Sequence, residues 1–205
     1  MAYITVDELR AYMKDPGQLS QNVYEDAIAA AEIEINSMCG RYFDLDSGTS
    51  DRFYWPDDPY SIQVDDIATT TGLLINVDQI GDGTYTQPWT ITTDFFLEPV
   101  NQIQAGIKGW PFNTVQATLT TKYFPLKRAY YYRRPTVKIT ATWGWPAVPV
   151  AVKQATAVVA NKLVKMGEAP FGVAGYDQWG TIRVGNIPEV QNLLNPFLND
   201  RYVVA

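Results

Sequence analysis

The side chains that most often carry out catalysis are scarce in this chain. Histidine is absent, which removes the commonest general base, the usual catalytic triads and the commonest metal ligand at once. The single cysteine, Cys39, lies beside Met38 in a helical pattern, where a free cysteine is usually a small packing residue. No glycine-rich loop has the spacing of a phosphate-binding or dinucleotide-binding site. We therefore expect no catalytic residue and no cofactor, and a chain that is not an enzyme.

Two acidic, glycine-containing segments, residues 44–48 (DLDSG) and 78–83 (DQIGDG), have some of the oxygen ligands of a calcium loop. An EF-hand loop needs a bidentate glutamate at its twelfth position, which is Trp55 in the first segment and Trp89 in the second. Ile80 also occupies a ligand position of the second segment. We expect solvated turns at both places and no metal site.

Other polar clusters favour structural roles too. The pairs Asp57-Asp58 and Asp65-Asp66 are poor candidates for an acid and a base, because adjacent residues of a strand point to opposite faces. Residues 130–134 (YYYRR) mix aromatic rings with positive charge, as proteins that stack single-stranded nucleic acid do. The chain has a formal net charge of −6, however, and no basic stripe accompanies the run. We expect two of these tyrosines to pack.

The aromatic content leaves one alternative from another class of function. Exposed tryptophans can form a carbohydrate-binding face, but subunit interfaces are also enriched in tryptophan, tyrosine and phenylalanine. The candidates for such a face are Trp55, Trp89, Trp110, Trp143 and Trp145. A noncatalytic sugar-binding module therefore stays open at this point.

The length and composition predict a folded protein. With 205 residues, 46% of them apolar, the chain is long enough for one domain, or for one domain with a large insertion. Its negative charge disfavours a surface that grips DNA or an anionic membrane. The start MAYITVDELRAYM lacks the pattern of a signal peptide, and no uncharged apolar stretch reaches the roughly 20 residues of a membrane span. We expect a soluble protein made in the cytoplasm.

Helical patterns lie at both ends of the sequence. Thr5 and Glu8 form a capping box before a short helix over residues 6–14. Ser20 is placed to cap a second helix, which Gly40 ends and whose apolar face we predict to be Val23, Ala27, Ala31, Ile35 and Cys39. Pro149 suits the first position of a third helix with Val152, Ala155, Val159 and Leu163 on one stripe, and Pro188 opens a short last helix to Leu194.

The middle of the sequence has the period-two pattern of strands. In the clearest strand, residues 136–143, we expect Val137, Ile139, Ala141 and Trp143 on the buried face and Thr136 on the other. Residues 81–83 (GDG) are typical of a hairpin connection. We predict an α+β fold, with a helical core of two long helices and short terminal helices from residues 1–43 and 144–205, and a β-rich insertion of residues 44–143.

The order of motifs resembles the head-to-tail connector, or adaptor, proteins of tailed bacteriophages over nearly the whole chain. The most specific pieces are WGWPAVP running into the VKQAT helix and the APFGVAG loop that follows, with AAAEIEINSMCGRYFD in support. The resemblance implies a virion neck protein, assembled in the host cytoplasm, that forms a ring, usually of twelve copies, docked on the portal protein. A head-completion stopper or another neck protein is the alternative within this class.

The resemblance also implies the partners and the surfaces that meet them. Its subunits would contact one another, the portal and a downstream stopper or tail terminator. DNA would pass through the channel of the ring without specific binding. The resemblance implies no contact with a membrane. We expect the glycine-rich loop over residues 170–179 and the tail over residues 195–205 to contact the portal or the adjacent ring. The candidate interface residues are Pro170, Phe171, Val173, Tyr176, Trp179, Phe197, Tyr202, Val203 and Val204.

Overall fold

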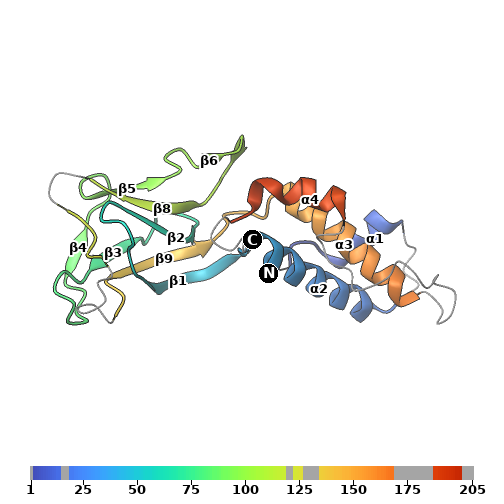
Figure 1. Cartoon of the computed structure of the whole chain (residues 1–205). Coiled ribbons are helices and arrows are strands. Elements are labelled where there is room, and N and C mark those ends of the chain that lie inside the picture. The colour runs from blue at the N-terminus through green and yellow to red at the C-terminus, as the bar shows by residue number, and fades with distance from the viewer. Residues whose placement is uncertain (1, 15–18, 119–121, 127–133, 169–186, 200–205) are drawn as a thin grey trace. The chain divides into compact units, whose positions relative to one another are not determined.

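The computed structural model describes residues 2–14, 19–118, 122–126, 134–168 and 187–199. Its described residues combine α-helices with a curled antiparallel sheet, in agreement with the predicted α+β class (Figure 1). They form two compact units: a helical unit drawn from Met1–Asp44 and Val148–Ala205, and a sheet unit, Leu45–Ala147. The sequence placed the corresponding boundaries at residues 43/44 and 143/144.

The first helix, α1 (Val6–Met13), begins at the predicted capping box. The Glu8 backbone N–H donates to the Thr5 hydroxyl at 3.1 Å, and the Thr5 N–H donates to the Glu8 carboxylate at 2.7 Å. This backbone donor holds the pKa of Glu8 below its usual value. Lys14, in the left-handed conformation, ends the helix, so the predicted range of residues 6–14 is confirmed to within one residue.

Helix α2 (Gln21–Cys39) has Ser20 at its N-cap position and the left-handed Gly40 at its C-cap, as predicted, although the Ser20 side chain makes no capping hydrogen bond. The prediction for Val23 was wrong, because its side chain is 39% exposed while Tyr24 is fully buried. Steps of four residues advance 400° around a helix, so a strict four-residue stripe drifts off the core and a three-residue step must correct it. The buried face is Tyr24, Ala27, Ile28, Ala31, Ile35 and Cys39.

Helix α3 (Val150–Glu168) packs against α2, α1 and α4 (Pro188–Leu194). Pro149 lies one residue before the first helical residue, and its carbonyl accepts from the Lys153 N–H at 3.0 Å. Val152, Ala155 and Val159 are buried as predicted, whereas Leu163 is only half-buried. Pro188 occupies the first turn of α4, and a 3-10 turn, Asn195–Phe197, follows.

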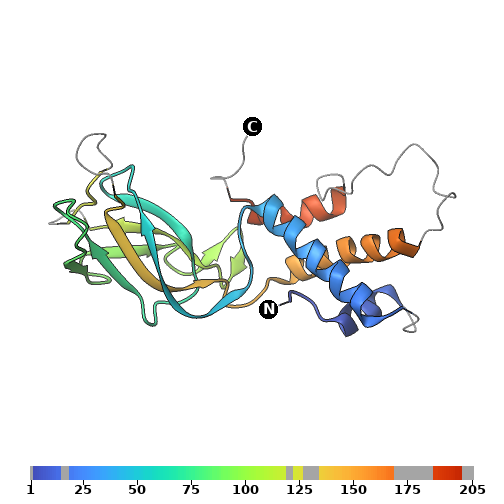
Figure 2. The same ribbon diagram turned by 90° about the horizontal axis from the view of Figure 1, so that it is seen from below.

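Seven strands form the main sheet, in the order β4-β3-β9-β2-β8-β5, with β1 paired to β9 beside this path (Figures 1 and 2). Their bounds are β1 Leu45–Tyr54, β2 Ser61–Ile67, β3 Leu74–Val77, β4 Gln87–Trp89, β5 Phe95–Glu98, β8 Phe112–Ala117 and β9 Val137–Gly144. A separate hairpin joins β6 (Ile103–Gln104) to β7 (Ile107–Lys108). The connection between β3 and β4 contains residues 81–83, as predicted for a hairpin.

Strand β9 organises the sheet unit, because it pairs with β1, β2 and β3. Val137, Ile139, Ala141 and Trp143 alternate into the core and are fully buried, which confirms the predicted face. The prediction for Thr136 was wrong. It precedes the strand and is fully buried, and its hydroxyl donates to the Pro125 carbonyl at 2.9 Å.

Candidate assembly surfaces

Cys39 is a packing residue in the helical unit. Its side chain is 1% exposed at the end of α2, and burial raises the pKa of its thiol to about 12. The thiolate is the reactive form of cysteine, so almost none of it exists at neutral pH. The predicted packing role of this residue is confirmed.

The second acidic segment folds around a buried carboxylate. Asp78 is 1% exposed, and its Oδ1 accepts the N–H groups of Ile80 and Gly81 at 3.2 and 2.7 Å. Its Oδ2 accepts the Gly83 N–H at 2.7 Å. These oxygens hold the β3–β4 connection together from inside, so the segment is a structured turn. We expected a solvated turn, and for Asp78 that prediction was wrong, because its carboxylate is buried.

The first acidic segment is not a turn, and that prediction was wrong. Residues 45–48 belong to β1, which pairs with β9 from Leu45 opposite Gly144, with an irregular register before Thr49. The pairing partner of Leu45 lies about a hundred residues away in sequence, which local composition cannot reveal. Across the parts of the chain that the structure describes, no three histidine, cysteine or acidic residues gather where a metal ion could bind.

The paired acids of β2 have separate partners, as predicted for adjacent strand residues. Asp65 accepts from the Arg52 guanidinium and the Tyr54 hydroxyl, both at 2.9 Å, while Asp66 accepts from the Trp145 indole N–H at 3.0 Å. The Arg52 guanidinium also lies 4.4 Å from the ring centre of Trp143. Two acids held apart by such partners do not form an acid–base pair, and the cluster ties β1 to β2.

The candidate carbohydrate-binding face loses most of its side chains to the core. Four of the five tryptophans are buried, and only Trp55 is exposed, by 42%. The buried ones are Trp89, Trp110, Trp143 and Trp145, of which Trp110 packs edge-on to Trp145 at 4.9 Å between ring centres. Their place in the core removes the platform on which that alternative depended.

Most of the predicted interface residues lie outside the described residues, namely Pro170, Phe171, Val173, Tyr176, Trp179, Tyr202, Val203 and Val204, as do residues 130–133 of the tyrosine run. Phe197 is described and is 1% exposed. Its ring packs edge-on to Phe43 at 5.7 Å, and Phe43 packs in the same way on Tyr3. Phe197 therefore contributes to the core of the helical unit in this chain.

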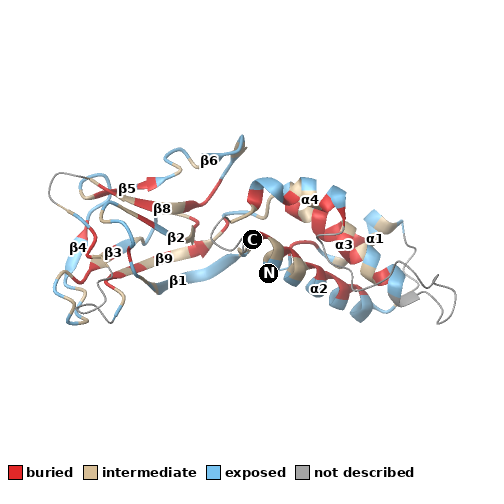
Figure 3. Cartoon of the chain, viewed as in Figure 1, coloured by how far each residue is buried: buried red, intermediate tan, exposed pale blue. Residues whose placement is uncertain are grey.

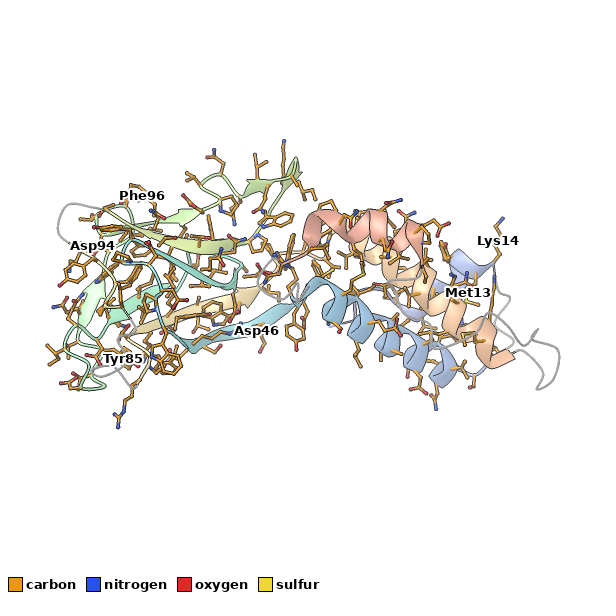
Figure 4. All side chains as sticks on the ribbon, viewed as in Figure 1. Met13, Lys14, Asp46, Tyr85, Asp94 and Phe96 are labelled. Atoms are coloured by element: carbon orange, nitrogen blue, oxygen red, sulfur yellow. The ribbon has the colours of Figure 1, made fainter. Side chains whose placement is uncertain are left out.

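The sheet unit presents β1 to solvent (Figure 3). Residues 45–51 are exposed on both faces, and no strand pairs with the outer edge of β1 within the described part of the sheet unit. Phe53 is half exposed and contacts the ring of Tyr85 at 5.5 Å. Asp46, near the start of β1, and Tyr85 are labelled in Figure 4. Sequence reasoning missed this surface because it had assigned residues 44–48 to a turn.

A second exposed feature is the β6–β7 hairpin. Val100 and Ile103 expose apolar side chains there, and Trp110 anchors the following segment in the core. The Trp110 N–H donates to the Gln102 carbonyl at 3.0 Å, which closes the base of the hairpin. A shallow, open groove beside it is lined by Glu98, Pro99, Val100, Gln104, Asn113 and Thr114.

The helical unit carries opposite charges on two helices. Helix α2 contains Glu25, Asp26, Glu32 and Glu34 and no lysine or arginine. Helix α3 contains Lys153, Lys162 and Lys165, with its one acid, Glu168, at the last position. Exposed apolar residues accompany the charges, since Ile33 of α2 is 70% exposed and Val150 of α3 is 80% exposed.

Comparison with known proteins adds a structural likeness. No protein-family model matches the sequence, and no curated protein matches it. No helix in the described ranges is long and apolar enough to cross a membrane. Among solved structures the chain is similar to one described as the neck of an empty GTA particle computed with C6 symmetry; a GTA, or gene transfer agent, is a phage-like particle. The likeness has a TM-score of 0.55 and 16% sequence identity, and it covers 99% of this chain and 93% of that one, so the two proteins share a fold.

Proposed function

We propose that this chain is a structural subunit of the neck of a tailed phage or phage-like particle, and that it is the head-to-tail connector, or adaptor, of that neck. The observation that carries the proposal is the shared fold with a neck protein over nearly the full length of both chains. Such coverage includes the helical unit and the sheet unit together, which a chance likeness of one unit would not do.

A neck subunit acts by contact, and the chemistry of the chain agrees with that. The sequence has no histidine, its cysteine is buried, and the acids of β2 are bound to Arg52, Tyr54 and Trp145. We therefore propose a noncatalytic role in the virion, with exposed surfaces such as β1 and the β6–β7 hairpin available for neighbouring proteins.

The proposed assembly is a ring docked on the portal protein, with a stopper or tail terminator on its other side. C6 symmetry is obeyed by a closed ring of six copies and equally by a ring of twelve. We propose twelve copies. A net charge of −6 suits the wall of a channel through which DNA slides, because like charges do not hold the phosphate backbone.

The experiment is to mix the purified full-length chain with the portal protein of its phage and to image the product by electron microscopy. We expect a second ring, coaxial with the portal, and the mass of the complex then distinguishes six copies from twelve. The absence of any coaxial ring, with the portal or with the other neck proteins, would overturn the proposal.

A head-completion stopper is the second candidate, because the similar structure is that of a whole neck and does not single out one ring within it. The same mixing experiment separates the two. An adaptor binds the isolated portal, whereas a stopper binds only after an adaptor ring is already in place. Binding that requires a separate adaptor would therefore replace the first proposal with the second.

A further inference from the structure

The exposed side of α2 forms a continuous acidic and apolar strip. Five of its exposed residues recur at steps of three and four, opposite the buried face that begins at Tyr24 and ends at Cys39, so these five lie on one side of the helix. They are Asn22, Asp26, Ala29, Ile33 and Ser37, with Glu25 exposed beside them. Figure 3 shows this division of α2 into a buried and an exposed side. We call this set the α2 strip.

The outer side of α3 forms a second strip of opposite charge. The outward residues again follow steps of three and four, starting from the exposed Val150. They are Val150, Gln154, Val158, Lys162 and Lys165, of which Val158 is half-buried and the others are exposed. We call this set the α3 strip. No acidic side chain belongs to it, as no basic side chain belongs to the α2 strip.

A ring of identical subunits needs two different surfaces on each copy, because each contact joins one patch to another patch of the next copy. The two strips satisfy this requirement within one rigid helical core, since α2 and α3 pack directly on each other through their buried faces.

The two strips also differ in the size of their central side chains. The α2 strip has the small Ala29 at its centre, and the α3 strip has the larger, branched Val158. A small residue on one helix leaves space for a larger one on a facing helix, which lets the two surfaces interdigitate. Each strip has in addition one large exposed apolar side chain, Ile33 or Val150.

The geometry points to a head-to-tail contact in which the α2 strip of one copy docks on the α3 strip of the next. This inference rests on the proposed ring and names its interface. Opposite charges select this pairing and disfavour the two like pairings, α2 with α2 and α3 with α3, in which the same charges would face each other. Exposed Ile33 and Val150 are covered by the contact, which accounts for their presence on the surface of a small helical unit.

The first test is a charge exchange. The variants are Glu25→Lys with Asp26→Lys, Lys162→Glu with Lys165→Glu, and all four changes in one chain. Each double variant places like charges across every contact, and we expect it to raise the dissociation constant for self-association, or the concentration needed for ring formation on the portal, about tenfold, which corresponds to about 1.4 kcal/mol. The fourfold variant restores opposite charges and should return to within about threefold of the parent.

The second test is covalent trapping. Ile33→Cys and Gln154→Cys place one accessible thiol on each strip, while Cys39 stays buried and unreactive. The chain with both changes, treated with a short bis-maleimide during ring formation on the portal, should give a ladder of linked copies that ends at the size of the ring. Each single variant, as the matched control, should give no covalently linked copies.

The outcomes separate this inference from the function on which it rests. Rings that form on the portal without a ladder, or a dimer from Ile33→Cys alone, overturn the inference and leave the neck function standing. Double charge-exchange variants that form rings on the portal as readily as the parent also overturn the inference. If neither rings nor a ladder form, the ring and the proposed function fall together.

Discussion

Replacing Asp78 is expected to loosen the sheet unit at one defined point. The Asp78→Ala change removes both carboxylate oxygens, which leaves the N–H groups of the half-buried Gly81 and Gly83 without their 2.7 Å acceptors. A hydrogen bond to a charged group contributes about 1.5 kcal/mol or more to stability. Two such bonds give a loss of about 3 kcal/mol in the free energy of unfolding of the sheet unit. Asp78→Asn keeps the Oδ1 acceptor and should lose about half as much.

The assay is urea denaturation followed by tryptophan fluorescence, because the buried tryptophans described in the structure all belong to the sheet unit. Helical circular dichroism at the same time follows the other unit, which we expect not to change. Asp82→Ala is the matched control, since this neighbouring acid is exposed and accepts hydrogen bonds from the exposed Thr84. The reasoning is refuted if Asp78→Ala shifts the fluorescence transition no more than Asp82→Ala does.

Further expectations concern other sites of the chain. Calcium or EDTA should leave the unfolding midpoint of the sheet unit unchanged, and a rise with calcium would contradict the structural role of Asp78. In the β6–β7 turn, Ala105 and Gly106 have φ of 50° and 77°, so Ala105→Asn should stabilise the hairpin by about 1 kcal/mol, seen as slower amide exchange. Burial raises the pKa of Glu32, so its ionisation opposes folding as the pH rises through the folded-state pKa. Glu32→Gln should therefore stabilise the helical unit at pH 7. At acidic pH, where Glu32 is protonated, this gain in stability should disappear. Cys39 should react with a thiol reagent at pH 8 only after unfolding, and rapid reaction of the native chain would contradict its burial.

Local signals in the sequence predicted the helices well. The capping box at Thr5, the left-handed Gly40 and the helix-opening Pro188 each act within a few residues, so their patterns specify where helices begin and end. Which face of a helix is buried was predicted less accurately. A four-residue repeat placed Val23 in the core, whereas the neighbouring Tyr24 fills that place because it adjusts for the 3.6-residue turn.

Pairing between distant segments limited what the sequence could predict about the sheet and about the candidate surfaces. The alternation of β9 was visible in the sequence because all its buried residues lie on one strand. Residues 45–48 were assigned to a turn, since only their partner β9 makes them a strand. The sequence could not show which tryptophans are buried, because the same residue type occurs in a core and on a binding face. The charge difference between α2 and α3 was present in the sequence, but which charges face outward became clear only from the packed helices.

The position of β9 near the end of the sheet unit determines how late the chain can fold during its synthesis. Strand β1 pairs with β9, and α2 packs against α3, so each unit closes only after residues more than eighty positions downstream have been synthesised. At about 5–20 residues per second, a nascent chain keeps its early strands and the apolar face of α2 uncovered for at least several seconds. A chain cut short before β9 can close neither unit, and it leaves strand edges and aromatic side chains open to chaperones and proteases. Late closure thus acts as a length check, because a chain that ends before β9 stays unfolded and can be degraded.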